Sequence, residues 1–113
     1  MKDDYFKVVY QILDYLYSCM REGIQPELKN YTWDSEALQI NKSYWESIMT
    51  NLAEEGYIKG VTFKKVIGRE KPAMVIRDIG ITSKGIEYLA ENSSMQKVKK
   101  VTKSIFEIIG YFI

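Results

Sequence analysis

Two strand-like runs, residues 58–66 and 73–79, lie close together in this sequence, and the second is rich in Val and Ile. Gly68 and Pro72 lie between them, and both favour a turn or a longer hairpin loop. Amphipathic helical patterns precede and follow the pair. The sequence therefore predicts a β-hairpin flanked by helices, which places the chain in the α+β class.

The first predicted helix spans residues 4–21. Its apolar residues recur at steps of three and four, which places them on one helical face. We interpret this face as the side that packs into the core. Its members are Phe6, Val9, Leu13, Leu16 and Met20.

The segment after this helix is predicted to be irregular. Residues 24–31 contain Pro26 and are interpreted as a loop. A short strand is expected at residues 31–33, followed by a brief second helix at residues 34–39. Asp34 is a suitable N-cap for that helix, because its carboxylate can accept from free backbone N–H groups.

A third helix is predicted to begin with a capping box formed by Ser43 and Glu46 and to end at Gly56. One face of it is apolar and is predicted to be buried. This stripe consists of Trp45, Ile48, Met49 and Leu52. A fourth helix is expected to begin at the cap Thr82 and to end near residues 91–93.

This order of elements is that of a winged helix-turn-helix domain: helix, short strand, helix, helix, strand, wing, strand, helix. Two local stretches support it. Residues 52–58 resemble the end of the recognition helix in bacterial winged-helix regulators, and residues 81–89 resemble the segment after their wing. We predict a winged-helix domain over residues 1–92 and an additional C-terminal amphipathic helix over residues 93–113.

A wider pattern joins residues 4–10, residues 56–58 and residues 85–93, the last continued by Met95, Lys97, Lys99 and Lys100. This pattern resembles the YjcQ-like family and covers most of the chain. The resemblance implies a small winged-helix protein of Gram-positive bacteria or their prophages. It brings no catalytic residues with it.

Catalysis is not expected from this composition. The sequence has no histidine and one cysteine, Cys19, so the commonest general base and the commonest metal ligand are missing. Neither a phosphate-binding P-loop nor a dinucleotide-binding glycine motif occurs. We predict a non-enzyme with no cofactor and no metal. No secretion signal or membrane span is visible in the sequence, so the cytoplasm is the predicted location.

Charge is divided unevenly along the chain. Residues 1–56 hold 5 basic and 10 acidic residues, a net charge of −5, whereas residues 57–113 hold 11 basic and 5 acidic, a net charge of +6. The wing is basic and the third helix, residues 43–56, has no lysine or arginine. Phosphate neutralisation supplies much of the affinity for DNA, so a wing-led contact with double-stranded DNA is predicted. The candidate residues are Lys42, Ser43, Tyr44, Ser47, Thr50, Asn51, Lys64, Lys65, Arg69 and Lys71.

Two alternatives stay open for this surface. The wing lysines can simply keep an exposed hairpin soluble and prevent edge-to-edge pairing. The acidic third helix and the charge division also fit a protein-interaction module that docks a partner protein. In either case no catalytic role is expected.

The C-terminal segment, residues 94–111, allows three interpretations. It can pack on the first helix, pair with a second copy to form a homodimer, or lie on a membrane surface. The two packing interpretations are favoured over the membrane, because amphipathic ends are common in soluble helices. Its apolar repeat is too short for a free coiled coil. The candidate dimer interface is Val98, Val101, Ile105, Ile108 and Phe112.

Overall fold

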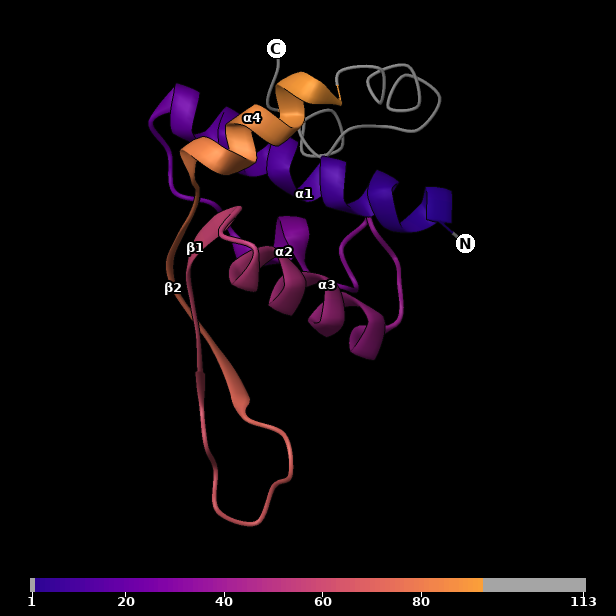
Figure 1. Ribbon diagram of the computed structural model, residues 1–113, viewed down its shortest axis with the longest axis vertical. Coiled ribbons are helices and arrows are strands. Elements are labelled where there is room, and N and C mark those ends of the chain that lie inside the picture. The colour runs from indigo at the N-terminus through magenta and orange to yellow at the C-terminus, as the bar shows by residue number, and fades with distance from the viewer. Residues whose placement is uncertain (1, 93–113) are drawn as a thin grey trace.

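A computed structural model describes residues 2–92 of the chain, with side chains from residue 4 onward. The elements are α1 (Lys2–Glu22), α2 (Leu28–Tyr31), α3 (Lys42–Glu54), β1 (Ile58–Lys64), β2 (Ala73–Ile81) and α4 (Ser83–Glu91). Figure 1 shows the helices gathered into one body, from which the antiparallel pair β1–β2 projects as a long arm. The predicted α+β winged-helix class is confirmed. The expected C-terminal helix, with Val98, Val101, Ile105, Ile108 and Phe112, lies outside the described residues.

The long helix α1 is the centre of the core, and it packs against α3, α4 and β2 (Figure 1). Its buried side chains include Ile12, Leu13 and Cys19, none of which is exposed at all. Two expected core residues, Phe6 and Met20, are instead 46% and 50% exposed. Both lie near the ends of α1, where fewer neighbouring elements cover a helix than at its middle.

The segment between α1 and α3 differs from the prediction. A short helix, α2, forms where a loop was expected and ends at Tyr31. Residues 32–38 then form turns and bends in place of the strand predicted at residues 31–33 and the helix predicted at residues 34–39. The cause is a set of tertiary hydrogen bonds to the phenol oxygen of Tyr15. It accepts from the backbone N–H of Glu27 at 3.1 Å and from Nδ2 of Asn30 at 3.0 Å. These bonds fix residues 27–31 against α1, and tertiary contacts of this kind override local propensity.

The N-caps show one correction and one confirmation. The side chain of Asn41 caps α3, because its Oδ1 accepts from the backbone N–H groups of Ser43 at 2.8 Å and Tyr44 at 3.3 Å. The predicted cap, Ser43, is therefore inside the helix. Thr82 caps α4 as predicted, since its Oγ1 accepts from the N–H of Gly85 at 3.2 Å.

The buried face of α3 is confirmed, with Trp45, Ile48, Met49 and Leu52 all buried. Trp45 also carries a polar constraint. Its Nε1 donates to the backbone carbonyl of Tyr31 at 2.8 Å, so the indole ties α3 to the end of α2. Gly56, with φ of +80°, ends the helix in the left-handed conformation as predicted.

We expect Trp45→Phe to destabilise the domain, because the substitution leaves the buried carbonyl of Tyr31 without its donor. Such a loss costs roughly 1–3 kcal/mol of unfolding free energy. Urea denaturation followed by circular dichroism measures it. Trp33→Phe is the matched control, since that indole is half-buried. Equal losses in the two variants would contradict a specific role for the Trp45 hydrogen bond.

Alkaline pH provides a second test of the core. Burial, and then the nearby Tyr15, raise the pKa of Tyr31 from 10.0 to about 12. A phenol whose pKa is higher when folded stabilises the protein below the unfolded value, and this stability is lost as the pH rises through the folded value. We expect the unfolding free energy to fall as the pH rises from 10.0 to about 12, the unfolded and folded pKa values of Tyr31. In Tyr31→Phe it should fall less steeply. Parallel pH profiles for the two proteins would show that Tyr31 does not contribute.

Candidate nucleic-acid interface

The β-hairpin is divided by a bulge into a part that packs on the body and a part that projects. The register runs from Ile58 opposite Ile81 to Lys59 opposite Gly80, and then shifts before Val61. Gly60 lies at the shift with φ of +86°. Three residues of β2, Arg77, Asp78 and Ile79, stand opposite Gly60, so the extra residues belong to β2. Because a bulge bends the strand that contains it, it redirects the arm away from the body. We call the projecting part, residues 61–76, the wing.

The two faces of the wing have different chemistry. Residues opposite each other in an antiparallel pair lie on the same face, and successive residues alternate. One face carries Val61 and Phe63 with Ile76 and Met74, and the other carries Thr62 and Lys64 with Val75 and Ala73. Phe63, Met74 and Ile76 line a groove beside α3. Most of the wing residues that line the groove from the strands belong to the apolar face. Ala73 from the other face also reaches the groove, whereas its partner Lys64 does not line it.

The groove between α3 and the wing has a volume of about 840 Å³. Most of the residues predicted to contact DNA line it. They come from both sides: Lys42, Ser43, Ser47, Thr50 and Asn51 from α3, and Arg69 and Lys71 from the wing. The fold thus places residues from two separate sequence segments around one groove.

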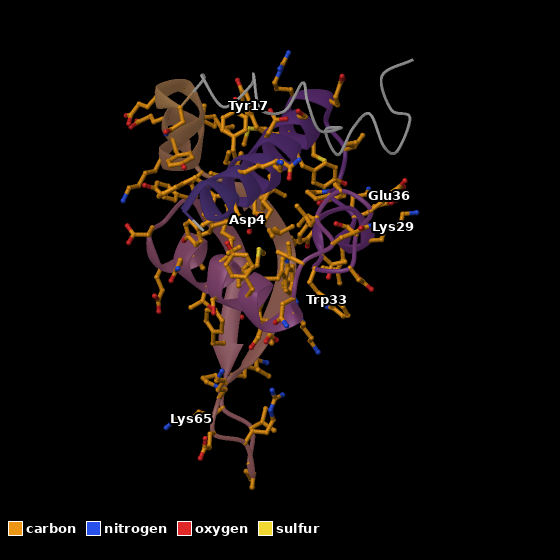
Figure 2. The ribbon with its side chains drawn as sticks, turned by 90° about the vertical axis from the view of Figure 1, so that its right-hand side faces the viewer. Asp4, Tyr17, Lys29, Trp33, Glu36 and Lys65 are labelled. Atoms are coloured by element: carbon orange, nitrogen blue, oxygen red, sulfur yellow. The ribbon has the colours of Figure 1, made fainter. Side chains whose placement is uncertain are left out.

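Lys64 and Lys65 are placed elsewhere on the wing. Lys64 is the last residue of β1 and does not line the groove, and Lys65 comes directly after the strand. Figure 2 shows Lys65 on the projecting arm, well away from the helices. Both lysines are exposed. The wing therefore presents cations on both of its faces.

Tyr44 is also placed outside the groove. Its half-buried ring lies 6.5 Å from that of Tyr5, measured between centroids. Burial, and then the carboxylate of Asp4, raise the pKa of the Tyr44 phenol. Tyr44 thus faces the N-terminal part of α1, and stacking on a base would require its ring to leave this contact.

The YjcQ family model, described as YjcQ protein, matches residues 10–108 of the chain. The chain belongs to the YjcQ family. This confirms the resemblance seen in the sequence. No curated protein and no solved structure matches the chain.

Two further findings concern the part of this YjcQ family member that the structure describes. None of its helices there is long and apolar enough to cross a membrane. The same residues contain no group of three or more Cys, Asp or Glu side chains placed to hold a metal ion.

Hydrogen bonds within α3 determine what its polar face can offer. Ser47 Oγ donates to the carbonyl of Ser43 at 3.2 Å, and Thr50 Oγ1 donates to that of Glu46 at 2.7 Å. Both hydroxyl hydrogens are thus engaged, and the oxygens are left as acceptors. Asn51 Nδ2 donates to Tyr5 Oη at 3.1 Å, so its amide group is also oriented. In this arrangement the helix face is suited to accept hydrogen bonds from a ligand.

The groove carries both signs of charge. Glu46 and Glu54 from α3 line it together with the three cations Lys42, Arg69 and Lys71. Within the described part of the chain the one salt bridge is that of Lys29 with Glu27, at 3.4 Å. The groove cations are therefore not neutralised there by a carboxylate in contact, and they are exposed to a ligand.

The sequence prediction missed the apolar residues of the groove. Trp33 and Leu28 line it from the segment before α3, and Phe63, Met74 and Ile76 from the wing. The alternation of apolar residues along the two strands was the available signal. This signal could not be used without the register of the two strands, which shifts at the bulge opposite Gly60.

We expect Gly60→Ala to destabilise the hairpin by more than its positive φ alone explains. A Cβ atom here would lie 2.6 Å from the carbonyl oxygen of Arg77 and 2.7 Å from that of Asp78. Strain of this kind costs roughly 1–3 kcal/mol in unfolding free energy. Gly56→Ala is the matched control, because Gly56 has φ of +80° and nothing within 4 Å of the added Cβ. Urea denaturation compares them, and equal losses would contradict a steric role for the bulge.

Proposed function

We propose that this YjcQ family member is a winged-helix DNA-binding protein, in which the wing supplies affinity and α3 reads the duplex. One observation carries the proposal: the polar face of α3 and the cations of the wing line the same groove. A regulatory role in transcription, an origin in a bacterium or prophage and a cytoplasmic location belong to the proposal, as does the absence of catalysis. So does a homodimer formed through residues 98–112.

The distribution of charge on the wing supports DNA as the ligand. Arg69 and Lys71 lie at the groove, whereas Lys64 lies on the opposite face and Lys65 beside it. A ribbon with cations on both faces fits between two rows of phosphates, as in the minor groove of a duplex. Glu70 is the single acidic residue in this stretch, so the field of the wing is positive.

The chemistry of α3 supports a reading role more than a binding role. The helix brings Lys42 to the groove but also Glu46 and Glu54, so it gains little from phosphates. The hydroxyl oxygens of Ser47 and Thr50 are acceptors, which can receive hydrogen bonds from the amino groups of cytosine or adenine in the major groove. The carboxylates of Glu46 and Glu54 can accept a hydrogen bond from the amino group of cytosine in the same way.

A second candidate is a protein-interaction module, and the apolar lining of the groove favours it. Leu28 is 51% exposed and Phe63 is 38% exposed, and both line the groove with Trp33. An amphipathic peptide could place its apolar side against them. Purified protein that carries a stoichiometric protein partner, with an absorbance ratio showing no nucleic acid, would support this candidate over DNA binding.

Fluorescence anisotropy with mixed-sequence duplexes at a series of salt concentrations tests the DNA proposal. We expect the double variant Arg69→Gln, Lys71→Gln to weaken binding and to flatten the dependence of log K on log salt by about 0.9 for each phosphate that is no longer neutralised. The matched control is Arg21→Gln, Lys29→Gln, which removes the same charges from the last turn of α1 and from α2. Figure 2 shows Lys29 apart from the projecting arm. Absence of salt-sensitive binding by the unmodified protein, or equal effects of the two double variants, would overturn the proposal.

A further inference from the structure

The tip of the wing is a tight turn with an apolar residue at its corner. The backbone N–H of Arg69 donates to the carbonyl of Val66 at 3.1 Å, and Gly68 has φ of +88°. A positive φ at the third residue of a hydrogen-bonded turn is the mark of type II geometry. Ile67 is then the second residue, at the outer corner. Its exposed fraction is 103%, so its side chain contacts no other part of the described protein.

An isoleucine in this place contributes nothing to the folded core. Turn corners are usually occupied by Pro, Gly, Asn, Asp or Ser, which have local reasons to be there. Single exposed apolar residues are ordinary on protein surfaces. Here, however, half of the large exposed apolar residues in the described part lie on the wing, where Val66 and Phe63 accompany Ile67. Phe63 lines the groove, whereas Val66 and Ile67 lie at the tip itself. Two adjacent exposed apolar residues at the end of an arm favour a surface that is buried in a complex.

The charges around the tip identify the kind of partner. Lys65 precedes Val66, and Arg69 and Lys71 follow the turn, with Glu70 as the one acidic residue between them. An exposed apolar side chain flanked by cations is complementary to a polyanion whose interior is apolar. Stacked base pairs between two phosphate backbones have this composition. A flat lipid surface fits less well, because the polar groove between the wing and α3 would stay empty against it.

We propose that Ile67 is a minor-groove wedge, which inserts between adjacent base pairs and bends the duplex while the flanking cations hold the two backbones. This inference rests on the proposed DNA-binding function and extends it to a change in DNA shape. Insertion requires base pairs to unstack, which is easiest at pyrimidine–purine steps such as TpA. The wing is therefore expected to select flexible steps without hydrogen bonds to their bases.

Energy transfer between dyes at the two ends of a short duplex measures the bend. One duplex has a central TpA step, and a second, of equal composition, has ApT there. Ile67→Ser is compared with Met20→Ser, a control that removes an exposed apolar residue from α1. Circular dichroism verifies that both variants fold. All measurements are made at saturating protein, so that bending is separated from affinity, and anisotropy gives the affinity and its salt dependence.

We expect the unmodified protein and Met20→Ser to bend the TpA duplex more than the ApT duplex. Ile67→Ser should saturate the TpA duplex with an unchanged salt slope, but without the bend and with roughly tenfold weaker affinity. If the unmodified protein binds the duplex without bending it, or if Ile67→Ser bends the duplex equally well, the proposed wedge role of Ile67 is wrong. The proposed DNA-binding function is not affected by that result. If the unmodified protein shows no salt-sensitive binding to either duplex, DNA binding itself fails. Binding to phosphatidylglycerol vesicles that depends on Ile67 would in that case assign the tip to a lipid surface.

Discussion

The burial of Trp45 sets the orientation of α3, and with it the surface that the molecule presents. The indole is 6% exposed and its Nε1 is bonded to the carbonyl of Tyr31. A helix with one side fixed in this way has no freedom to rotate about its axis, because rotation would expose apolar surface and break the hydrogen bond. Since residues three and four apart share a face, Ser43, Ser47 and Thr50 must point away from the core. The polar face of α3 is thus a consequence of packing on the opposite side.

The wing is governed by a different constraint. Beyond the bulge no side chain of the two strands is fully buried. Val61, Met74 and Ile76 pack against the edge of the core, whereas residues 62–64 are exposed. This exposure allows the wing to carry cations on both faces and apolar residues at its tip, which a packed strand could not do. The residues that stabilise the fold and those proposed for recognition therefore lie mainly on opposite sides of Gly60. The body holds the buried residues, and the arm holds most of the charge that distinguishes this surface.

How far the sequence predicts this structure depends on whether a feature is local. The buried stripe of α3 and the cap Thr82 follow from residues within a few positions of one another, and both were predicted. The position of α2 depends on Tyr15, which is 12 residues from Glu27 and 15 from Asn30, so no local pattern indicates it. For α3, the sequence predicted Ser43 as the cap, and the structure uses Asn41, two residues earlier.

The candidate site shows the same division. The polar residues of α3 could be named from helical periodicity, but Tyr44 is drawn toward α1 by Tyr5, a neighbour in space and not in sequence. The face that carries Lys64 depends on a register shift, and alternation alone cannot locate it. The apolar wall of the groove was missed for the same reason. Charge composition identified the wing as basic, whereas only the fold shows which of its cations lie at the groove and which do not.

The acidic residues of α3 have a role in this arrangement under the proposed function. A helix that carried several lysines would bind any duplex through its phosphates, and its contacts with bases would add little discrimination. Glu46 and Glu54 at the groove make close approach of α3 to the backbone unfavourable unless the wing cations compensate for it. Binding energy then comes first from the wing, and α3 reaches the base edges only in a duplex that the wing has engaged. Affinity and discrimination are in this way assigned to separate elements, and the groove between them is where the two must act together.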